Sequence, residues 1–131
     1  MKILIVEDEF TSRLLLNEIL KPYGAVHIAI NGREAVEAVS DAFETNAPYD
    51  LICLDIMMPE MDGQTALKKI RDLEEAKGIR STRGTKIVMT TALNDVENVM
   101  KAFSGLCDAY VFKPFDKTKL LAELRKLGLI P

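Results

Sequence analysis

The sequence is poor in the residues that disulfide and zinc chemistry need. Among its 131 residues are 2 cysteines and 1 histidine, and they do not have the spacing of a zinc site. Cys53 and Cys107 lie in or beside apolar runs, so we expect buried thiols rather than a disulfide. The chain also lacks a glycine-rich phosphate loop after its first apolar run, where EDEFTS stands. This argues against a nucleotide-binding fold.

A large excess of one charge and long hydrophobic runs are also missing. The net charge is −3, so the sequence shows no electrostatic footprint of direct nucleic-acid binding. No apolar run approaches the roughly 20 residues of a membrane helix, and the N-terminal MKILIVEDE lacks the long apolar segment of a signal peptide. We therefore expect a cytoplasmic protein without a membrane partner, of the length of one domain.

Five short apolar runs alternate with five helical patterns along the chain. The runs are Ile3–Val6, Ala25–Ile30, Leu51–Leu54, Lys86–Met89 and Ala109–Phe112. Most of them are continuously apolar, which is typical of strands that are covered on both faces. The alternation predicts a doubly wound α/β fold, in which five parallel strands form a sheet with five helices on its two faces.

Capping residues agree with this division into elements. Asn31, with Glu34 three residues later, predicts the start of the second helix, and Asp116 is a candidate N-cap of the last one. Three glycines follow expected helices: Gly24, Gly78 and Gly128. The fourth helical pattern covers residues 96–103, and residues 77–86 are expected to form a solvated loop.

The ends of the expected strands bring acids, hydroxyls and one amine to the same edge of the sheet. Ligands of an open parallel sheet bind beyond the carboxyl ends of the strands. The polar residues at these ends are Glu7, Asp8, Asp55, Thr90, Thr91 and Lys113. Each residue alone is most simply a turn, a cap or a solvated side chain. Their coincidence at four strand ends indicates a functional site.

Three carboxylates at one edge repel each other. At ~4 Å and an effective dielectric near 20, each close pair costs about 4 kcal/mol, and Lys113 offsets only part of this. Oxygen ligands select a hard cation, so Glu7, Asp8 and Asp55 predict a Mg²⁺ site. Asp55 stands alone, whereas Glu7 and Asp8 are paired. We therefore expect Asp55 to be a nucleophile toward phosphorus, with Lys113 and a threonine hydroxyl neutralising phosphoryl charge.

Four segments of the chain resemble the motifs of the receiver domains of two-component response regulators. They are ILIVEDE, LICLDIMMPEMDG, IVMTTA and YVFKPF, in the order found in that family. The resemblance covers essentially the whole chain, residues 1–131, and implies a flavodoxin-like fold with strand order 2-1-3-4-5. We expect a stand-alone receiver domain without an output domain, with a fragment of a longer chain as the alternative.

The same resemblance implies a role for each matching residue at the site. Asp55 resembles the phosphorylated aspartate. The Mg²⁺ ligands that it implies are Glu7, Asp8, Asp55 and the main-chain carbonyl of Met57. Thr91 resembles the hydroxyl residue that binds the phosphoryl oxygens. Lys113 resembles the lysine of the site, with a cis bond to Pro114, and Tyr110 resembles the aromatic switch residue that turns inward on activation.

The resemblance also implies the partners of the protein. The phosphoryl group would come from a phosphohistidine on a sensor histidine kinase or a histidine phosphotransfer protein. His27 in the second strand is expected to be a solvated edge residue, so the donor must be another molecule. The phosphorylated domain would bind a downstream protein target through the fourth helix, fifth strand and fifth helix, as a monomer or weak homodimer.

Two apolar residues near the expected site bear on the lifetime of the phosphoryl group. In the family that the chain resembles, the positions two residues beyond the phosphorylated aspartate and the hydroxyl residue influence how water reaches the acyl phosphate. Met57 and Leu93 stand at these positions, and their apolar side chains cannot orient an attacking water. The resemblance therefore implies slow self-dephosphorylation.

An aspartyl-nucleophile phosphatase or phosphotransferase is one rival function, but such enzymes commonly have a second acid at the position of Met57. An interaction module with an inactive acid cluster is the other rival. The presence of all the key residue types argues against it.

Overall fold

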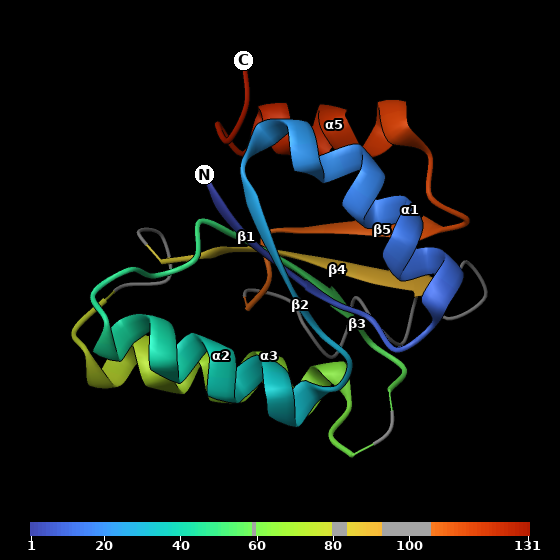
Figure 1. Ribbon diagram of the computed structural model, residues 1–131. Coiled ribbons are helices and arrows are strands. Elements are labelled where there is room, and N and C mark those ends of the chain that lie inside the picture. The colour runs from blue at the N-terminus through green and yellow to red at the C-terminus, as the bar shows by residue number, and fades with distance from the viewer. Residues whose placement is uncertain (59, 80–83, 93–105) are drawn as a thin grey trace.

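A five-stranded parallel sheet forms the centre of the molecule (Figure 1). The computed structural model describes residues 1–58, 60–79, 84–92 and 106–131. The strands lie in the order β2-β1-β3-β4-β5, which confirms the predicted fold and strand order. Their bounds are β1 Lys2–Val6, β2 Ala25–Ala29, β3 Leu51–Asp55, β4 Lys86–Ala92 and β5 Ala109–Lys113.

Helices cover both faces of this sheet. The described α-helices are α1 Phe10–Leu20, α2 Gly32–Glu44, α3 Gly63–Ala76 and α5 Lys117–Lys126, with a short 3-10 helix, η1, at Lys21–Tyr23. α1 and α5 lie on one face, whereas α2 and α3 lie on the other (Figure 1). The helix expected over residues 96–103 lies outside the described residues. Within the described ranges, no helix has the length and apolar character to cross a membrane.

β3 is the most deeply buried strand because it has a neighbour on each side and helices on both faces. All of its residues from Leu51 to Asp55 are buried. Ile52 and Leu54 pack with the α2/α3 layer, whereas Leu51 and Cys53 pack with the α1/α5 layer. Full burial of one such side chain stabilises the fold by about 1.5–3 kcal/mol. The apolar run that precedes Asp55 therefore fixes the position of this acid.

Both cysteines of the chain are thiols, as predicted. Cys53 is completely buried, and this burial raises the pKa of its thiol to about 12. Cys107 is half-buried before β5.

The predicted helix caps are present, and two further caps were not predicted. The Asn31 side chain accepts a hydrogen bond from the Glu34 N–H at 2.8 Å, and Asp116 caps α5 by accepting the N–H groups at its start. Glu9 caps α1 and Asp62 caps α3 in the same way. Gly78 and Gly128 follow α3 and α5 with φ of 75° and 76°, and Gly24 follows η1. Of the loop expected at 77–86, residues 80–83 lie outside the described part.

A buried charged cluster, which the sequence analysis did not find, lies at the amino ends of β4 and β5. Arg71 of α3 donates to Glu74 Oε1 at 2.6 Å and to the Thr85 carbonyl at 2.9 Å. It also donates to Asp108 Oδ2 at 3.0 Å and to the Leu106 carbonyl at 2.8 Å. We call Arg71, Glu74 and Asp108 the Arg71 cluster. It joins α3 to the segments before β4 and β5, opposite the edge where Asp55 lies.

Candidate functional site

Three acids meet at the carboxyl ends of β1 and β3, which are neighbours in the sheet. Glu7 and Asp8 follow β1, and Asp55 is the last residue of β3. One carboxylate oxygen of each acid lies within 4.8 Å of those of the other two. Glu7 is 0% exposed and Asp55 is 3% exposed, whereas Asp8 is exposed to solvent. The structure thus brings together the three acids that the strand ends predicted.

Lys113, the last residue of β5, reaches this group of acids. Its Nζ lies 2.5 Å from Glu7 Oε1 and 3.3 Å from Asp55 Oδ2. The bond between Lys113 and Pro114 is cis, as the resemblance implied. We call Glu7, Asp8, Asp55 and Lys113 the acid site. Three carboxylates face one ammonium there, which leaves two surplus negative charges if all are ionised.

Burial and close contacts shift the pKa values of two members of the acid site. Burial raises the pKa of the Glu7 carboxyl, and its contact with Asp55 raises this pKa further, while Lys113 opposes both effects. Burial alone would lower the pKa of Lys113. Its hydrogen bond to Glu7 and the charges of Asp55 and Glu7 outweigh that effect and raise the pKa. The lysine is therefore held as an ammonium ion between two acids.

The two threonines at the end of β4 differ in their surroundings. Thr90 pairs in register with Asp55, so the two side chains project to the same face of the sheet and Thr91 projects to the other. The Thr91 hydroxyl donates to the Ala92 carbonyl at 3.3 Å. The Thr90 hydroxyl is buried and has no hydrogen-bond partner among the described residues. Both hydroxyls are thus at the correct strand end, but this structure does not place Thr91 in a hydrogen bond with the acids.

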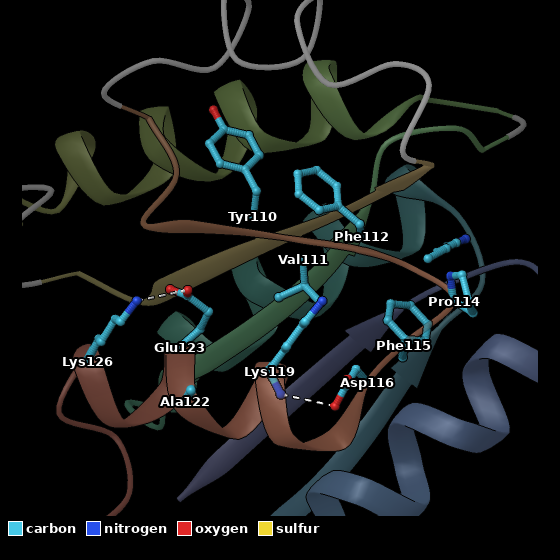
Figure 2. Close-up of a pocket in the computed structure, with 11 residues that line it drawn as sticks. Tyr110, Val111, Phe112, Pro114, Phe115, Asp116, Lys119, Ala122, Glu123 and Lys126 are labelled. Atoms are coloured by element: carbon cyan, nitrogen blue, oxygen red, sulfur yellow. Dashed lines mark hydrogen bonds and ion pairs between the residues drawn. The ribbon is translucent and has the colours of Figure 1, made fainter.

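A groove along the edge strand β5 and α5 is lined by residues of both elements, among them Tyr110 and Lys113. The groove has a volume of about 810 Å³. Figure 2 shows Tyr110 and Phe112 on one face of β5 and Val111 on the other, toward α5. Tyr110 is half-buried and packs beside the α2/α3 layer of the core. Burial and a hydrogen bond with the Cys107 thiol raise the pKa of its phenol.

Three further residues were singled out in the sequence: Met57, His27 and Leu93. The Met57 side chain is 72% exposed, and its main-chain N–H donates to Asp55 Oδ1 at 3.4 Å. Leu93 lies outside the described residues. His27 is an exposed residue of the edge strand, as expected. Its Nδ1 also lies 2.8 Å from the Tyr49 hydroxyl, a contact that was not predicted.

The acid site has the donor chemistry of a site for a hard divalent cation. Three carboxylate oxygens that are this close together repel each other unless a cation lies between them. Oxygen donors of this type suit Mg²⁺ better than a soft metal. The residues present therefore fit the cofactor that the sequence predicted.

Comparison with known proteins identifies the family to which a chain with this fold and this group of acids belongs. The family model described as "Response regulator receiver domain" matches residues 3–125. The chain belongs to the response regulator receiver family. Receiver domains act in two-component signalling and are signalling domains rather than classical enzymes. The family and fold that the sequence motifs suggested are thereby confirmed.

Curated relatives contain similar receiver domains within longer chains. The chain is 36% identical to hybrid signal transduction histidine kinase B of Dictyostelium discoideum, over 98% of its own length and 7% of the kinase. It is 35% identical to the transcriptional regulatory protein ResD of Bacillus subtilis, over 96% of its own length and 47% of ResD. The chain thus spans less than half the length of either relative.

Two solved receiver domains are informative for the site. The receiver domain of Ssk1 from Saccharomyces cerevisiae was crystallised together with the histidine phosphotransfer protein Ypd1. That structure has a TM-score of 0.81 and 31% identity, covering 98% of this chain and 88% of the other. The receiver domain of sensor histidine kinase PA1611 from Pseudomonas aeruginosa has a magnesium ion coordinated in its active-site cleft. Its TM-score is 0.74 with 28% identity, covering 97% of each chain.

Proposed function

We propose that this receiver domain accepts a phosphoryl group on Asp55 from a phosphohistidine of a sensor histidine kinase or a histidine phosphotransfer protein. The observation that supports this most directly is the convergence of Asp55 with two other acids and the Lys113 ammonium. The crystallised pair of yeast Ssk1 receiver domain and Ypd1 supports the proposed class of donor.

Mg²⁺ is the cofactor that we propose for the acid site. Glu7, Asp8, Asp55 and the main-chain carbonyl of Met57 would hold it, and the magnesium ion of the PA1611 receiver domain supports this assignment. When bound, Mg²⁺ neutralises negative charge on the oxygens of the phosphoryl group.

The residues of the chain itself would position the two reacting atoms. A carboxylate oxygen of Asp55 attacks phosphorus, the bond between phosphorus and the donor imidazole nitrogen breaks, and its electron pair stays on that nitrogen. Lys113 lies 3.3 Å from Asp55 Oδ2 and can move from this oxygen to a phosphoryl oxygen. Such positioning and charge neutralisation are the main requirements of phosphoryl transfer. The domain would therefore assist its own phosphorylation and dephosphorylation.

The proposed signal passes from Asp55 to the face formed by β5, α5 and the helix expected over residues 96–103. Thr91 would leave the Ala92 carbonyl and bind the phosphoryl group, and Tyr110 would turn inward. A change from 1:99 to 99:1 between two states requires about 5.5 kcal/mol. A few hydrogen bonds to the charged phosphoryl group, at about 1.5–3 kcal/mol each, suffice. The groove beside β5 and α5 belongs to the described part of this face.

The output that we propose is contact with a downstream protein. The net charge of −3 gives no support for direct nucleic-acid binding. We propose that residues 1–131 form a cytoplasmic receiver domain that is a monomer or weak homodimer.

Phosphorylation with a small-molecule donor tests the proposal. Incubation with acetyl phosphate and Mg²⁺ should add about 80 Da to the protein, and Asp55→Asn should abolish this addition. Asp72→Asn, which changes an exposed acid of α3, is the matched control and should be labelled normally. Absence of the addition in the unaltered protein would contradict the proposal. Repeated turnover of a phosphomonoester, instead of stoichiometric labelling, would favour the phosphatase alternative.

A further inference from the structure

The loop that follows Asp55 has an unusual backbone at its far end. Glu60 has a φ of 61° and Met61 a φ of 154°. Residues with a side chain rarely adopt such angles, which cost about 1–3 kcal/mol each unless the surroundings hold them. Contacts outside the loop must therefore stabilise this conformation.

The start of α2 makes these contacts. The Gly32 N–H donates to the Met61 carbonyl at 3.2 Å. The Asn31 side-chain amide donates to Glu60 Oε2 at 3.3 Å, and Arg33 lies 3.4 Å from the same oxygen. Three consecutive residues thus hold the two loop residues with positive φ.

Position 32 has no room for a side chain. A Cβ on Gly32 would lie 2.3 Å from the Met61 carbonyl oxygen. Asn31 is 7% exposed, and its two side-chain atoms have separate partners. Its Oδ1 accepts the Glu34 N–H and caps α2, while its Nδ2 binds Glu60. The helix start and the loop are therefore joined by close packing as well as by hydrogen bonds.

The other end of the loop is fixed directly at Asp55. The Gly63 N–H donates to the Ile56 carbonyl at 2.9 Å, and a Cβ on Gly63 would lie 2.3 Å from the Asp55 carbonyl oxygen. Met57, whose N–H binds the Asp55 carboxylate at 3.4 Å, lies between these two anchors. Because the loop between Ile56 and Met61 is short, a shift at Met61 would be passed on to the main chain at Met57, beside the Asp55 carboxylate.

We infer that Asn31, Gly32 and Arg33 are positioning residues of the acid site, which set the place of the loop that follows Asp55. This inference rests on the proposed function insofar as it concerns Mg²⁺. Removal of residues that orient metal ligands typically weakens metal binding by 10–100-fold. A similar loss should follow when the contact between Asn31 and Glu60 is broken.

Asn31→Asp is the most informative variant. Aspartate keeps the capping oxygen, but it loses the donor to Glu60 and faces that carboxylate with a like charge. The added negative charge would by itself strengthen Mg²⁺ binding, so a weakening of about tenfold or more reports a displaced loop. Glu44→Gln, at the exposed far end of α2, is the control and should change the Mg²⁺ affinity less than twofold. The second change Glu60→Gln in Asn31→Asp restores a donor and should recover most of the affinity.

Two measurements separate this inference from the proposed function. Mg²⁺ titration followed by NMR gives the affinities, and amide hydrogen exchange in metal-free buffer reports the loop itself. In Asn31→Asp the Gly32 and Gly63 amides should exchange at least tenfold faster than in the unaltered protein. Unchanged exchange, unchanged or tighter Mg²⁺ binding, or failure of Glu60→Gln to rescue would overturn the inference. No Mg²⁺ binding by the unaltered protein would instead contradict the proposed metal site, and the exchange rates would still decide the inference.

Discussion

The acid site and the Arg71 cluster are two groups of buried charges at opposite ends of the same sheet. In the Arg71 cluster, one guanidinium faces two carboxylates. Each of these carboxylates also accepts a hydrogen bond from a main-chain N–H group. Thr85 N–H donates to Glu74 at 2.7 Å, and Ile87 N–H donates to Asp108 at 2.8 Å. At the acid site, one ammonium faces three carboxylates, and the main-chain contacts to Glu7 and Asp55 are both 3.4 Å long.

The difference between the two groups agrees with a structural role for the Arg71 cluster and with the ligand-binding role that we propose for the acid site. Buried charges stabilise a fold only when partners and hydrogen bonds compensate their desolvation, and the Arg71 cluster meets this condition with short contacts on every side. The acid site keeps a charge surplus and long contacts that a ligand can improve. Burial alone does not distinguish the two groups, because each contains acids that are almost completely buried. The balance of charge and the quality of the hydrogen bonds distinguish them.

Removal of the central arginine should have the largest effect. Arg71→Met leaves the buried Glu74 and the half-buried Asp108 without their cation, so we expect the free energy of unfolding to fall by about 3–5 kcal/mol. Arg33→Met is the matched control, because Arg33 also contacts two acids but on the exposed surface, where such pairs contribute about 0–1 kcal/mol. Urea unfolding measures both. Equal losses would contradict the distinction between the two environments.

Magnesium should stabilise the protein through the acid site alone. At a free concentration 100 times its Kd, Mg²⁺ should raise the free energy of unfolding by about 2.7 kcal/mol. Asp8→Asn should remove most of this gain, since it removes one of the three oxygens that lie together. Glu74→Gln weakens the Arg71 cluster but should keep the whole gain. Thermal or urea unfolding with and without Mg²⁺ tests this, and a lost gain in Glu74→Gln would show that the two ends are coupled.

Replacing a buried threonine by valine should change the free energy of unfolding in opposite directions at the two ends of the sheet. Thr90 lies at the acid site with a buried hydroxyl that lacks a partner among the described residues, so Thr90→Val should raise the free energy of unfolding by about 1 kcal/mol. Thr85 lies at the other end, and its hydroxyl donates to the Tyr49 carbonyl at 2.8 Å. Thr85→Val should therefore lower the free energy by about 1 kcal/mol. Destabilisation by Thr90→Val would mean that this hydroxyl forms a hydrogen bond with a group outside the described residues.

The pH dependence of stability should show the smallest difference. The pKa of Glu7 is raised above its ordinary value of 4.5, mainly by burial, so the folded protein holds this proton when the unfolded chain has already lost it. In metal-free buffer the free energy of unfolding should consequently fall as the pH rises from 4.5 through the pKa of folded Glu7. Glu7→Gln should flatten this part of the curve. If the free energy of unfolding of the unaltered protein instead rose with pH relative to that of Glu7→Gln, burial would not dominate the pKa of Glu7.

Much of the fold could be predicted because it depends on local patterns. Continuous apolar runs identify buried parallel strands, and the carboxyl ends of such strands share one edge, so the grouping of Glu7, Asp8 and Asp55 followed from topology alone. The Arg71 cluster could not be predicted in this way. Arg71 and Asp108 are 37 residues apart, and periodicity only identifies Arg71 as part of a helix.

Other features were missed because the relevant signal is weak or ambiguous. Glutamate is not a preferred N-cap residue, so Glu9 gave no sign that it would cap α1. Asp62 precedes a glycine and is equally compatible with a turn. The orientation of Thr90 and Thr91 depends on the register of β4 with β3, and a shift of one residue exchanges the faces of all side chains. The sequence could therefore place both hydroxyls at the edge without deciding which one shares a face with Asp55.

The complete burial of Cys53 has a practical consequence for following this domain in solution. With a thiol pKa of about 12 and no exposed surface, Cys53 should not react with alkylating reagents in the folded protein. Cys107 is half-buried beside Tyr110, so the chain already contains one slowly accessible attachment point for a fluorophore or spin label. Its rate of modification offers a direct readout of the aromatic ring next to it, without any engineered cysteine.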